Sequence, residues 1–302
     1  MLDHSVALAG ITLLAAIVNG ALGYGFSSIT VPLALLFLSN RVLNPAIVII
    51  EVVLNAYVLF VNRAALPQVW RRVAPVVIGL APGVVVGTLI VAHVGPNWLK
   101  LGSYLVLLPL ILVQAAGYRR PVRAERSAGA VFGAGVGVLY SVTTISGPPL
   151  AVALNNQGFS KQEFRAALGL VRLAESSMTA VAYLAAGLFA TESMALVPYI
   201  LPNVLIGVPI GAFVIRHVRA ETFRRVCMSF DAWVVSFGTS ILLRDLHLVE
   251  GAPAFSAMAT VVVIDAWLLY RFFFGVADET PAMRIVHAVG AATAPEVDSA
   301  AT

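Results

Sequence analysis

The sequence predicts an all-α polytopic membrane protein. It has two inverted repeats, each a broken helical hairpin plus three transmembrane helices, with one extra C-terminal transmembrane helix. Of the 302 residues, 60% are hydrophobic and only 11% are charged, whereas about a quarter of the residues are charged in ordinary soluble domains. The apolar residues form blocks of about 20, the length that crosses the hydrocarbon core of a bilayer. A soluble globular protein is therefore excluded, and a transmembrane β-barrel would show short alternating segments instead.

Residues 1–118 are predicted to form the first repeat. Its first apolar block, 5–38, is interrupted between Gly20 and Pro32 by glycine, serine and threonine, and such a run breaks a helix. The block is therefore predicted to form two helical arms around a non-helical tip. Three uninterrupted blocks, predicted to cross the membrane, follow at 45–61, 73–93 and 98–117.

A basic segment at 119–126 is predicted to be a cytoplasmic linker, and residues 127–243 are predicted to form the second repeat. This repeat has an interrupted block at 127–155 and uninterrupted blocks at 165–188, 194–215 and 223–243. The block at 254–274 is the extra helix. The polar residues 276–302 are predicted to form a disordered cytoplasmic tail.

The distribution of Arg and Lys predicts the orientation. The loops near 62–72, 117–127, 156–165 and 216–225 hold thirteen of these cations: Arg63, Arg71, Arg72, Arg119, Arg120, Arg123, Arg126, Lys161, Arg165, Arg216, Arg219, Arg224 and Arg225. The alternate loops hold three: Arg41, Lys100 and Arg244. Because cytoplasmic loops carry the excess of basic residues, the N-terminus is expected outside and the C-terminus inside.

Internal similarity supports the two repeats. The segment from Gly83 to Val94 matches the segment from Gly207 to Val218 at five of twelve positions, including His93 and His217. Each copy contains an odd number of full crossings, so the second copy is inverted relative to the first. The G-x-x-x-G spacings in these segments predict close helix crossings.

The two predicted tips are the first candidates for a ligand site. Irregular backbone at membrane depth must be buried in protein or line a wet cavity, and helix N-termini and turn amides attract anions. No carboxylate lies in either tip, which favours an anion over a metal cation. The alternative is close helix packing through small residues. The candidate substrate-binding residues of the tips are Gly23, Tyr24, Gly25, Phe26, Ser27, Ser28, Tyr140, Ser141, Thr143, Thr144, Ser146 and Gly147.

Arg172 is a further candidate, because it lies two turns inside a predicted crossing and its planar fork suits an oxyanion. Asn55 is its partner position in the first repeat and is predicted to face the same cavity. The alternative for Arg172 is a neutralising ion pair with Glu175, three residues further on.

Four acidic residues are predicted to lie inside the membrane: Glu51, Glu175, Asp231 and Asp265. Buried carboxylates can bind protons at neutral pH, so each is a candidate for proton coupling. The alternative for each is a structural hydrogen-bond partner.

Catalytic signatures are absent from the sequence, which has no H-E-x-x-H, G-x-S-x-G or Walker motif. We therefore expect no enzyme activity, no cofactor and no metal. The net charge of +4 is explained by cytoplasmic loops rather than by nucleic acid.

The motifs resemble the sulfite exporter TauE/SafE family, also called the 4-toluene sulfonate uptake permeases, over roughly residues 5–275. The resemblance depends on Pro32-Leu33 and on Ser146-Gly147-Pro148-Pro149-Leu150, followed by Asn155-Asn156-Gln157-Gly158 and Arg165. In the first copy, Tyr24 and Phe26 interrupt a glycine run that is often denser in the family.

The resemblance implies transport of sulfite, sulfoacetate or another organosulfonate across the bacterial cytoplasmic membrane. The substrate is expected between the two tips at the bilayer midplane, as in secondary transporters built from inverted repeats. The alternative is a passive anion channel or a permease for a different small anion. The sequence leaves open the exact substrate, the direction, the coupling ion and whether the chain forms a homodimer.

Overall fold

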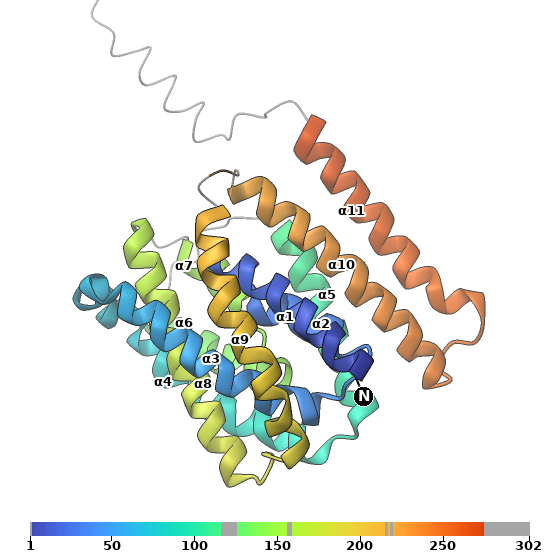
Figure 1. The fold of residues 1–302 in the computed structure, drawn as a ribbon, viewed down its shortest axis with the longest axis horizontal. Coiled ribbons are helices and arrows are strands. Elements are labelled where there is room, and N and C mark those ends of the chain that lie inside the picture. The colour runs from blue at the N-terminus through green and yellow to red at the C-terminus, as the bar shows by residue number, and fades with distance from the viewer. Residues whose placement is uncertain (1, 116–125, 156–158, 215–216, 218–219, 275–302) are drawn as a thin grey trace, which may run out of the picture.

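The computed structural model describes residues 2–115, 126–155, 159–214, 217 and 220–274, and this part of the chain is helical without strands (Figure 1). Its helices are α1 (Leu2–Leu22), α2 (Phe26–Ala34), α3 (Asn40–Val61), η1 (Arg63–Ala65), α4 (Leu66–His93), α5 (Pro96–Ala115), α6 (Arg126–Thr143), α7 (Gly147–Asn155), α8 (Lys161–Ala185), α9 (Thr191–Val214), α10 (Ala220–Asp245), η2 (Ala252–Phe255) and α11 (Ser256–Phe274). Residues 119–125 of the predicted linker and the predicted tail lie outside the described residues.

Local sequence signals explain several helix ends. Ser160 and Glu163 form a capping box at the start of α8, in which each side chain accepts a hydrogen bond from the other residue's backbone N–H, at 3.3 and 2.8 Å. A proline in its first turn starts α4. This helix begins at Leu66, about two turns before the predicted start of the crossing, so Arg71 and Arg72 lie on the helix rather than in a loop.

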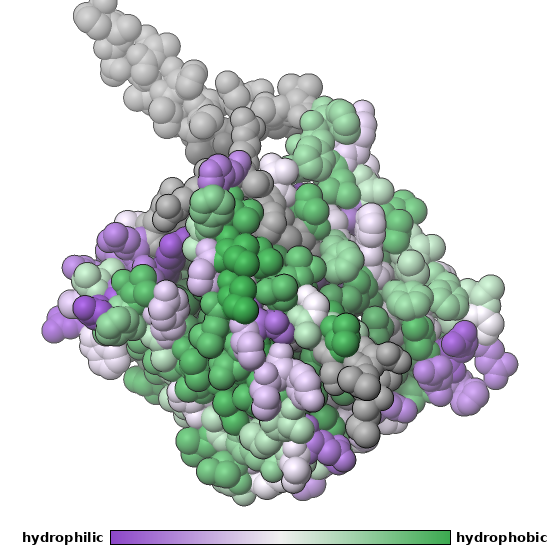
Figure 2. All heavy atoms as spheres, viewed as in Figure 1, coloured by the Kyte–Doolittle hydropathy of each residue, from purple (hydrophilic) through white to green (hydrophobic). Residues whose placement is uncertain are grey.

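The lengths of the apolar helices agree with those of a membrane protein. Among the described residues, four helical segments are long and apolar enough to cross a membrane by length and composition: Asn40–Val61, Arg63–His93, Thr191–Val214 and Ala252–Phe274. Figure 2 shows apolar residues over the middle of one face, with hydrophilic residues gathered mainly near the α3–α4 turn and near the α10–α11 connection.

Glycines bring the two halves of the chain into backbone contact. A Cβ on Gly83 of α4 would lie 2.0 Å from the carbonyl oxygen of Ala134 in α6, and a Cβ on Gly211 of α9 would lie 1.9 Å from that of Ile17 in α1. Side chains at these positions would hold the helices apart. The predicted close crossings at both G-x-x-x-G spacings are therefore confirmed.

The helix pairs are reciprocal between the halves. α1 packs on α9 and α6 packs on α4, α3 packs on α8, and α5 packs on α10. In an apolar 18-residue stretch of Asn40–Val61, 56% of the residues are buried, against 17% in the corresponding stretch of Ala252–Phe274. The α3–α8 pair therefore lies inside the protein, whereas α11 lies at the periphery beside α10 (Figure 1).

Candidate functional site

Both interrupted regions are broken helices with short tips, as the sequence predicts. The first tip is Gly23-Tyr24-Gly25, in which the two glycines have φ of 83° and 107°. The second tip is Thr144-Ile145-Ser146, in which Thr144 has φ of 55°. Left-handed backbone residues let the chain leave one helix and begin another within three residues.

The first tip contacts the helix that begins at the second. A Cβ on Gly147, the first residue of α7, would lie 3.4–3.8 Å from side-chain atoms of Tyr24. A Cβ on Gly23 would lie 3.9 Å from Nε of Arg165, near the start of α8. The structure thus brings the first tip together with α7 and α8, which belong to the other half.

Arg172 and Glu51 form a buried ion pair where α8 packs on α3. Nη2 of Arg172 donates to Oε1 of Glu51 at 2.6 Å, and the hydroxyl of Tyr140 donates to Oε2 of Glu51 at 2.7 Å. Arg172 is 2% exposed, and Glu51 and Tyr140 are fully buried. Glu175, the alternative ion-pair partner from the sequence, lies farther away, with its Oε1 4.0 Å from Nε of Arg172. The ion pair with Glu175, the alternative given by the sequence, is therefore present as the longer contact, and helix packing adds Glu51 as the closer partner.

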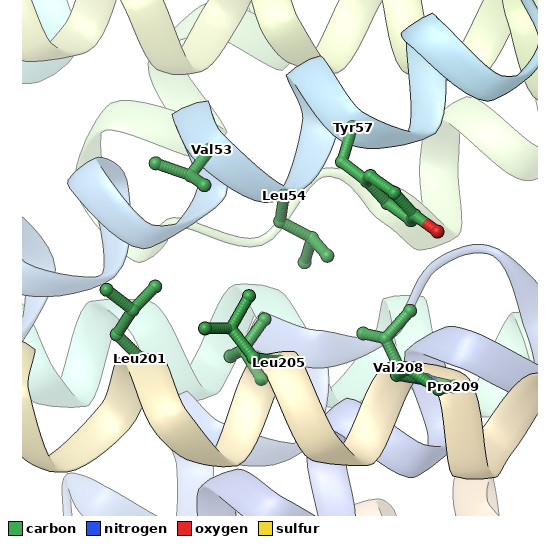
Figure 3. A pocket seen from close by; sticks show the side chains of 8 residues that line it. Val53, Leu54, Tyr57, Leu201, Leu205, Val208 and Pro209 are labelled. Carbon is green, nitrogen blue, oxygen red and sulfur yellow. The ribbon is translucent and has the colours of Figure 1, made fainter.

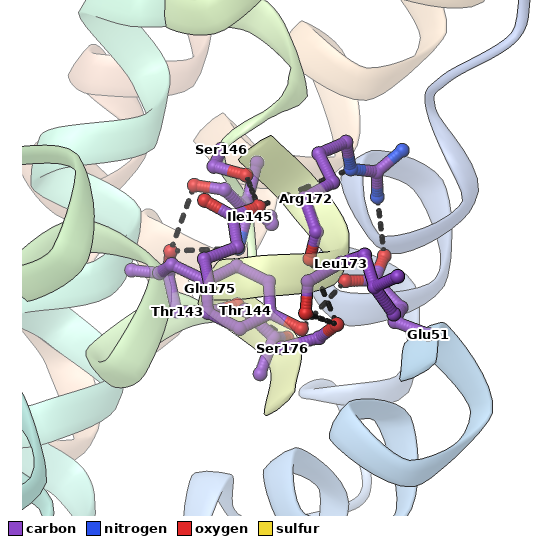
Figure 4. Close-up of polar contacts among 10 residues, drawn as sticks. Glu51, Thr143, Thr144, Ile145, Ser146, Arg172, Leu173, Glu175 and Ser176 are labelled. Carbon is purple, nitrogen blue, oxygen red and sulfur yellow. Dashed lines mark hydrogen bonds and ion pairs between the residues drawn. The ribbon is translucent and has the colours of Figure 1, made fainter. Parts of the chain in front are cut away.

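Glu175 connects this ion pair to the second tip. The hydroxyl of Ser146 donates to Oε1 of Glu175, and Figure 4 shows both side chains beside Arg172. The α3–α8–tip cluster is defined here as Glu51, Tyr140, Ser146, Arg172 and Glu175. It combines residues from α3, α6, α8 and the second tip.

Hydroxyl groups near the second tip bond mainly to nearby backbone. Ser141 donates to the carbonyl of Gly137 at 2.8 Å, Thr143 to that of Leu139 at 2.7 Å, and Thr144 to that of Thr143 at 2.7 Å. By contrast, several buried polar atoms of the first half have no hydrogen-bond partner among the described residues, including Ser28 Oγ, Thr30 Oγ1 and Asn55 Nδ2. Ser27 and Phe26 are buried at the start of α2.

Asp265 lies in a second buried ion pair, between α10 and α11. Nη2 of Arg225 donates to Oδ1 of Asp265 at 3.0 Å, and Ser229 donates to the same oxygen at 3.2 Å. Arg225 is predicted from the sequence to lie in a cytoplasmic loop, and this is wrong, because Arg225 lies on α10 and is 2% exposed. Asp231 is buried on the same helix, and its Oδ1 has no hydrogen-bond partner among the described residues.

Two open cavities bordered by described residues are apolar. One, of about 260 Å³, lies between α3 and α9, where Val53, Leu54 and Tyr57 face Leu201 and Leu205 (Figure 3). The other, of about 380 Å³, lies between α4, α5 and α6 and reaches Thr143. Neither is lined by Arg172 or by a carboxylate, so their linings do not suit an anion.

The described residues contain no group of three or more His, Cys, Asp or Glu side chains that could hold a metal ion. The chemistry of the α3–α8–tip cluster is instead that of one guanidinium, two carboxylates and two hydroxyls, all buried among apolar helices. Intramembrane charges in such a position indicate a substrate or ion pathway.

Two broken hairpins, with charged side chains gathered in the interior beside the second tip, are typical of the class of membrane transporters. The sequence model of the family described as "Sulfite exporter TauE/SafE" matches residues 8–236. The chain belongs to this family, which confirms the resemblance. The family consists of membrane transporters, not enzymes, and membership implies transport of sulfite or a related sulfur-containing anion.

The match ends within α10, so it does not include α11, which the predicted range of about 5–275 did include. Comparisons with curated proteins and with solved structures each found no match.

Proposed function

We propose that the chain is a secondary transporter that moves sulfite, sulfoacetate or another small organosulfonate across the bacterial cytoplasmic membrane. The observation that carries this proposal is the burial of Arg172 on α8, beside the second hairpin tip. A charge inside a membrane costs from ~2.5 to more than 10 kcal/mol on different scales. Binding of an anionic substrate is a functional reason for a buried arginine at this position, and the planar guanidinium matches the geometry of an oxyanion.

The anion is proposed to lie between the two tips, within reach of Arg172. Nε of Arg172 makes no hydrogen bond in the described structure, and neither do Ser28 Oγ and Asn55 Nδ2. These groups can donate to an oxyanion without first breaking a protein hydrogen bond. The remaining candidate contacts are the tip residues named from the sequence, with backbone N–H groups contributing as much as side chains.

The reciprocal packing supports two inverted repeats. α1 of the first half packs on α9 of the second, and α6 of the second half packs on α4 of the first. α2 likewise contacts α10 as α7 contacts α5. Two halves related in this way can rock against each other around a fixed site, which is how inverted repeats give alternating access.

Burial of the cluster favours a carrier over a passive channel. Arg172, Glu51 and Glu175 are each at most 2% exposed, so the proposed anion partner is occluded on both sides. A carrier requires an occluded state. Proteoliposomes loaded with unlabelled sulfoacetate should take up labelled sulfoacetate by counterflow, whereas conductance without exchange would favour a channel.

The role of Arg172 is tested by a binding screen on purified protein. We expect one or more of sulfite, sulfate, sulfoacetate, taurine, isethionate and thiosulfate to raise the thermal midpoint, because a ligand that binds only the native state stabilises it. Arg172→Lys should weaken that binding more than tenfold, or about 1.4 kcal/mol. Unchanged affinity in a folded Lys variant would remove Arg172 from the site.

A further inference from the structure

The α3–α8–tip cluster contains two carboxylates but one cation. Glu51 uses both of its oxygens, one to accept from Arg172 at 2.6 Å and the other to accept from Tyr140 at 2.7 Å. Glu51 is therefore the matched anion of Arg172. Glu175 is left as the second carboxylate of the cluster.

Glu175 lacks the compensation that an ionised carboxylate needs inside a protein. Its Oε1 accepts from Ser146, its Oε2 has no hydrogen-bond partner among the described residues, and Nε of Arg172 is 4.0 Å away. Its side chain is fully buried. An uncompensated buried charge is strongly destabilising, and such a group is normally neutralised by a proton.

Among the described residues, the surroundings of Glu175 offer no other counter-charge. Arg172 faces it from its own helix, Glu51 from α3, Tyr140 from α6 and Ser146 from the second tip. α4, α7 and η1 also pack on α8, and Arg63, the charged residue of η1, is exposed. The sequence of α7 contains no titratable side chain, and the charged residues of α4 lie near its ends rather than on its buried face.

We propose that Glu175 carries one proton in the occluded state and binds it together with the transported anion. This rests on the proposed function. With Glu175 protonated, the cluster is neutral overall and no longer repels an anion, and Nε of Arg172 and the proton on Oε2 can both donate to it. When the proton leaves Oε2, the carboxylate of Glu175 competes for Nε of Arg172 and repels the anion. Binding of the proton therefore strengthens binding of the anion, and the two cross the membrane in the same direction.

The link to movement is the Ser146 hydrogen bond. Ser146 is the last residue of the second tip, so loss of the proton strengthens its bond to the carboxylate and holds the tip against α8. Protonation weakens that bond, which frees the tip as the anion arrives. The two other buried acids outside the cluster differ from Glu175: Asp265 is paired with Arg225, and Asp231 has no described contact with a tip.

Infrared spectroscopy tests the proton without any substrate. In the full-length protein at neutral pH, the band of a protonated carboxylic acid should be present, and a component of it should be lost in Glu175→Gln. Asp231→Asn is the matched control and should retain that component. A Glu175→Gln spectrum identical to the wild-type spectrum would overturn the proposal, whatever the substrate.

Transport measurements test the coupling, with sulfoacetate as the probe. In vesicles held at zero membrane potential, one pH unit stores about 1.4 kcal/mol per proton, so one proton per anion gives up to about tenfold accumulation. Wild type and Asp231→Asn should accumulate sulfoacetate in response to the pH gradient, and Glu175→Gln should not. A response that persists in Glu175→Gln, or is lost in Asp231→Asn alone, would overturn the coupling role. Absence of sulfoacetate exchange in wild type would count against the proposed function and leave the infrared result standing.

Discussion

The crossing of α4 and α6 allows a quantitative test of how the two halves pack. A Cβ on Gly83 would lie 2.0 Å from the carbonyl oxygen of Ala134, and ordinary contact begins at 3.4 Å, so the helices must separate by about 1.4 Å to accept alanine. Overpacking of a tight interior costs about 1–3 kcal/mol. We therefore expect Gly83→Ala to lower the stability of the protein by this amount.

Gly135 on α6 provides the matched control. A Cβ there would meet nothing within 4 Å, and alanine is better than glycine in a helix by up to about 1 kcal/mol. Gly135→Ala should therefore be neutral or stabilising. At the reciprocal crossing of α1 and α9, Gly211→Ala and Gly10→Ala form the corresponding pair, because a Cβ on Gly211 would lie 1.9 Å from the carbonyl oxygen of Ile17 whereas one on Gly10 would meet nothing within 4 Å.

The assay is thermal unfolding of the purified variants in detergent, followed by the fluorescence of the four tryptophans. A loss of 1–3 kcal/mol should lower the midpoint by several degrees, since about 1 kcal/mol corresponds to roughly 2–4 °C in a domain of 150–250 residues. Equal midpoints for Gly83→Ala and Gly135→Ala would refute the close crossing. If Gly211→Ala and Gly10→Ala then had different midpoints, the α4–α6 and α1–α9 crossings would not be equivalent.

Three further predictions concern α11, the tips and the start of α8. Asp265→Asn should lower the stability of the protein, by up to about 3–5 kcal/mol if Arg225 stays buried without its partner. The affinity for the anion should not change, and a parallel loss of affinity would connect α11 to the binding site. Gly147→Val should abolish anion binding in a folded protein, because the valine side chain would meet Tyr24 of the first tip. Gly25→Val should also lower stability, because φ of Gly25 is 107°. Binding measured per amount of folded protein separates the two effects. The N–H of Ser160 holds the pKa of Glu163 below its usual value. The stabilisation from ionised Glu163 should be present above the unfolded-state pKa of about 4.3 and lost as pH falls below that value. The thermal midpoints of wild type and Glu163→Gln should therefore differ at neutral pH and converge in acid.

The sequence by itself determined the class of protein and the positions of the helices. Apolar length, glycine and proline are local signals, because each acts on the backbone or on the bilayer directly. For the same reason the breaks at Gly23 and Thr144 and the crossings at the G-x-x-x-G spacings could be predicted. The relation between the two tips was less well determined. Gly20 and Gly137 lie equally far before Pro32-Leu33 and Pro149-Leu150, but Gly20 is followed by two more residues of α1 and Gly137 by six more residues of α6. One additional helical turn thus precedes the second tip.

Only the tertiary structure decided which charged groups are partners. Arg172 pairs most closely with Glu51, 121 residues away, rather than with Glu175 on its own helix, and Arg225 pairs with Asp265, 40 residues away. A helix that is apolar on most of its surface can rotate about its axis without changing its hydrophobic pattern. The rotation of α3 against α8 is therefore fixed by packing between helices, and that rotation brings Glu51 to Arg172 and leaves Glu175 beside Ser146 with one carboxylate oxygen unpaired.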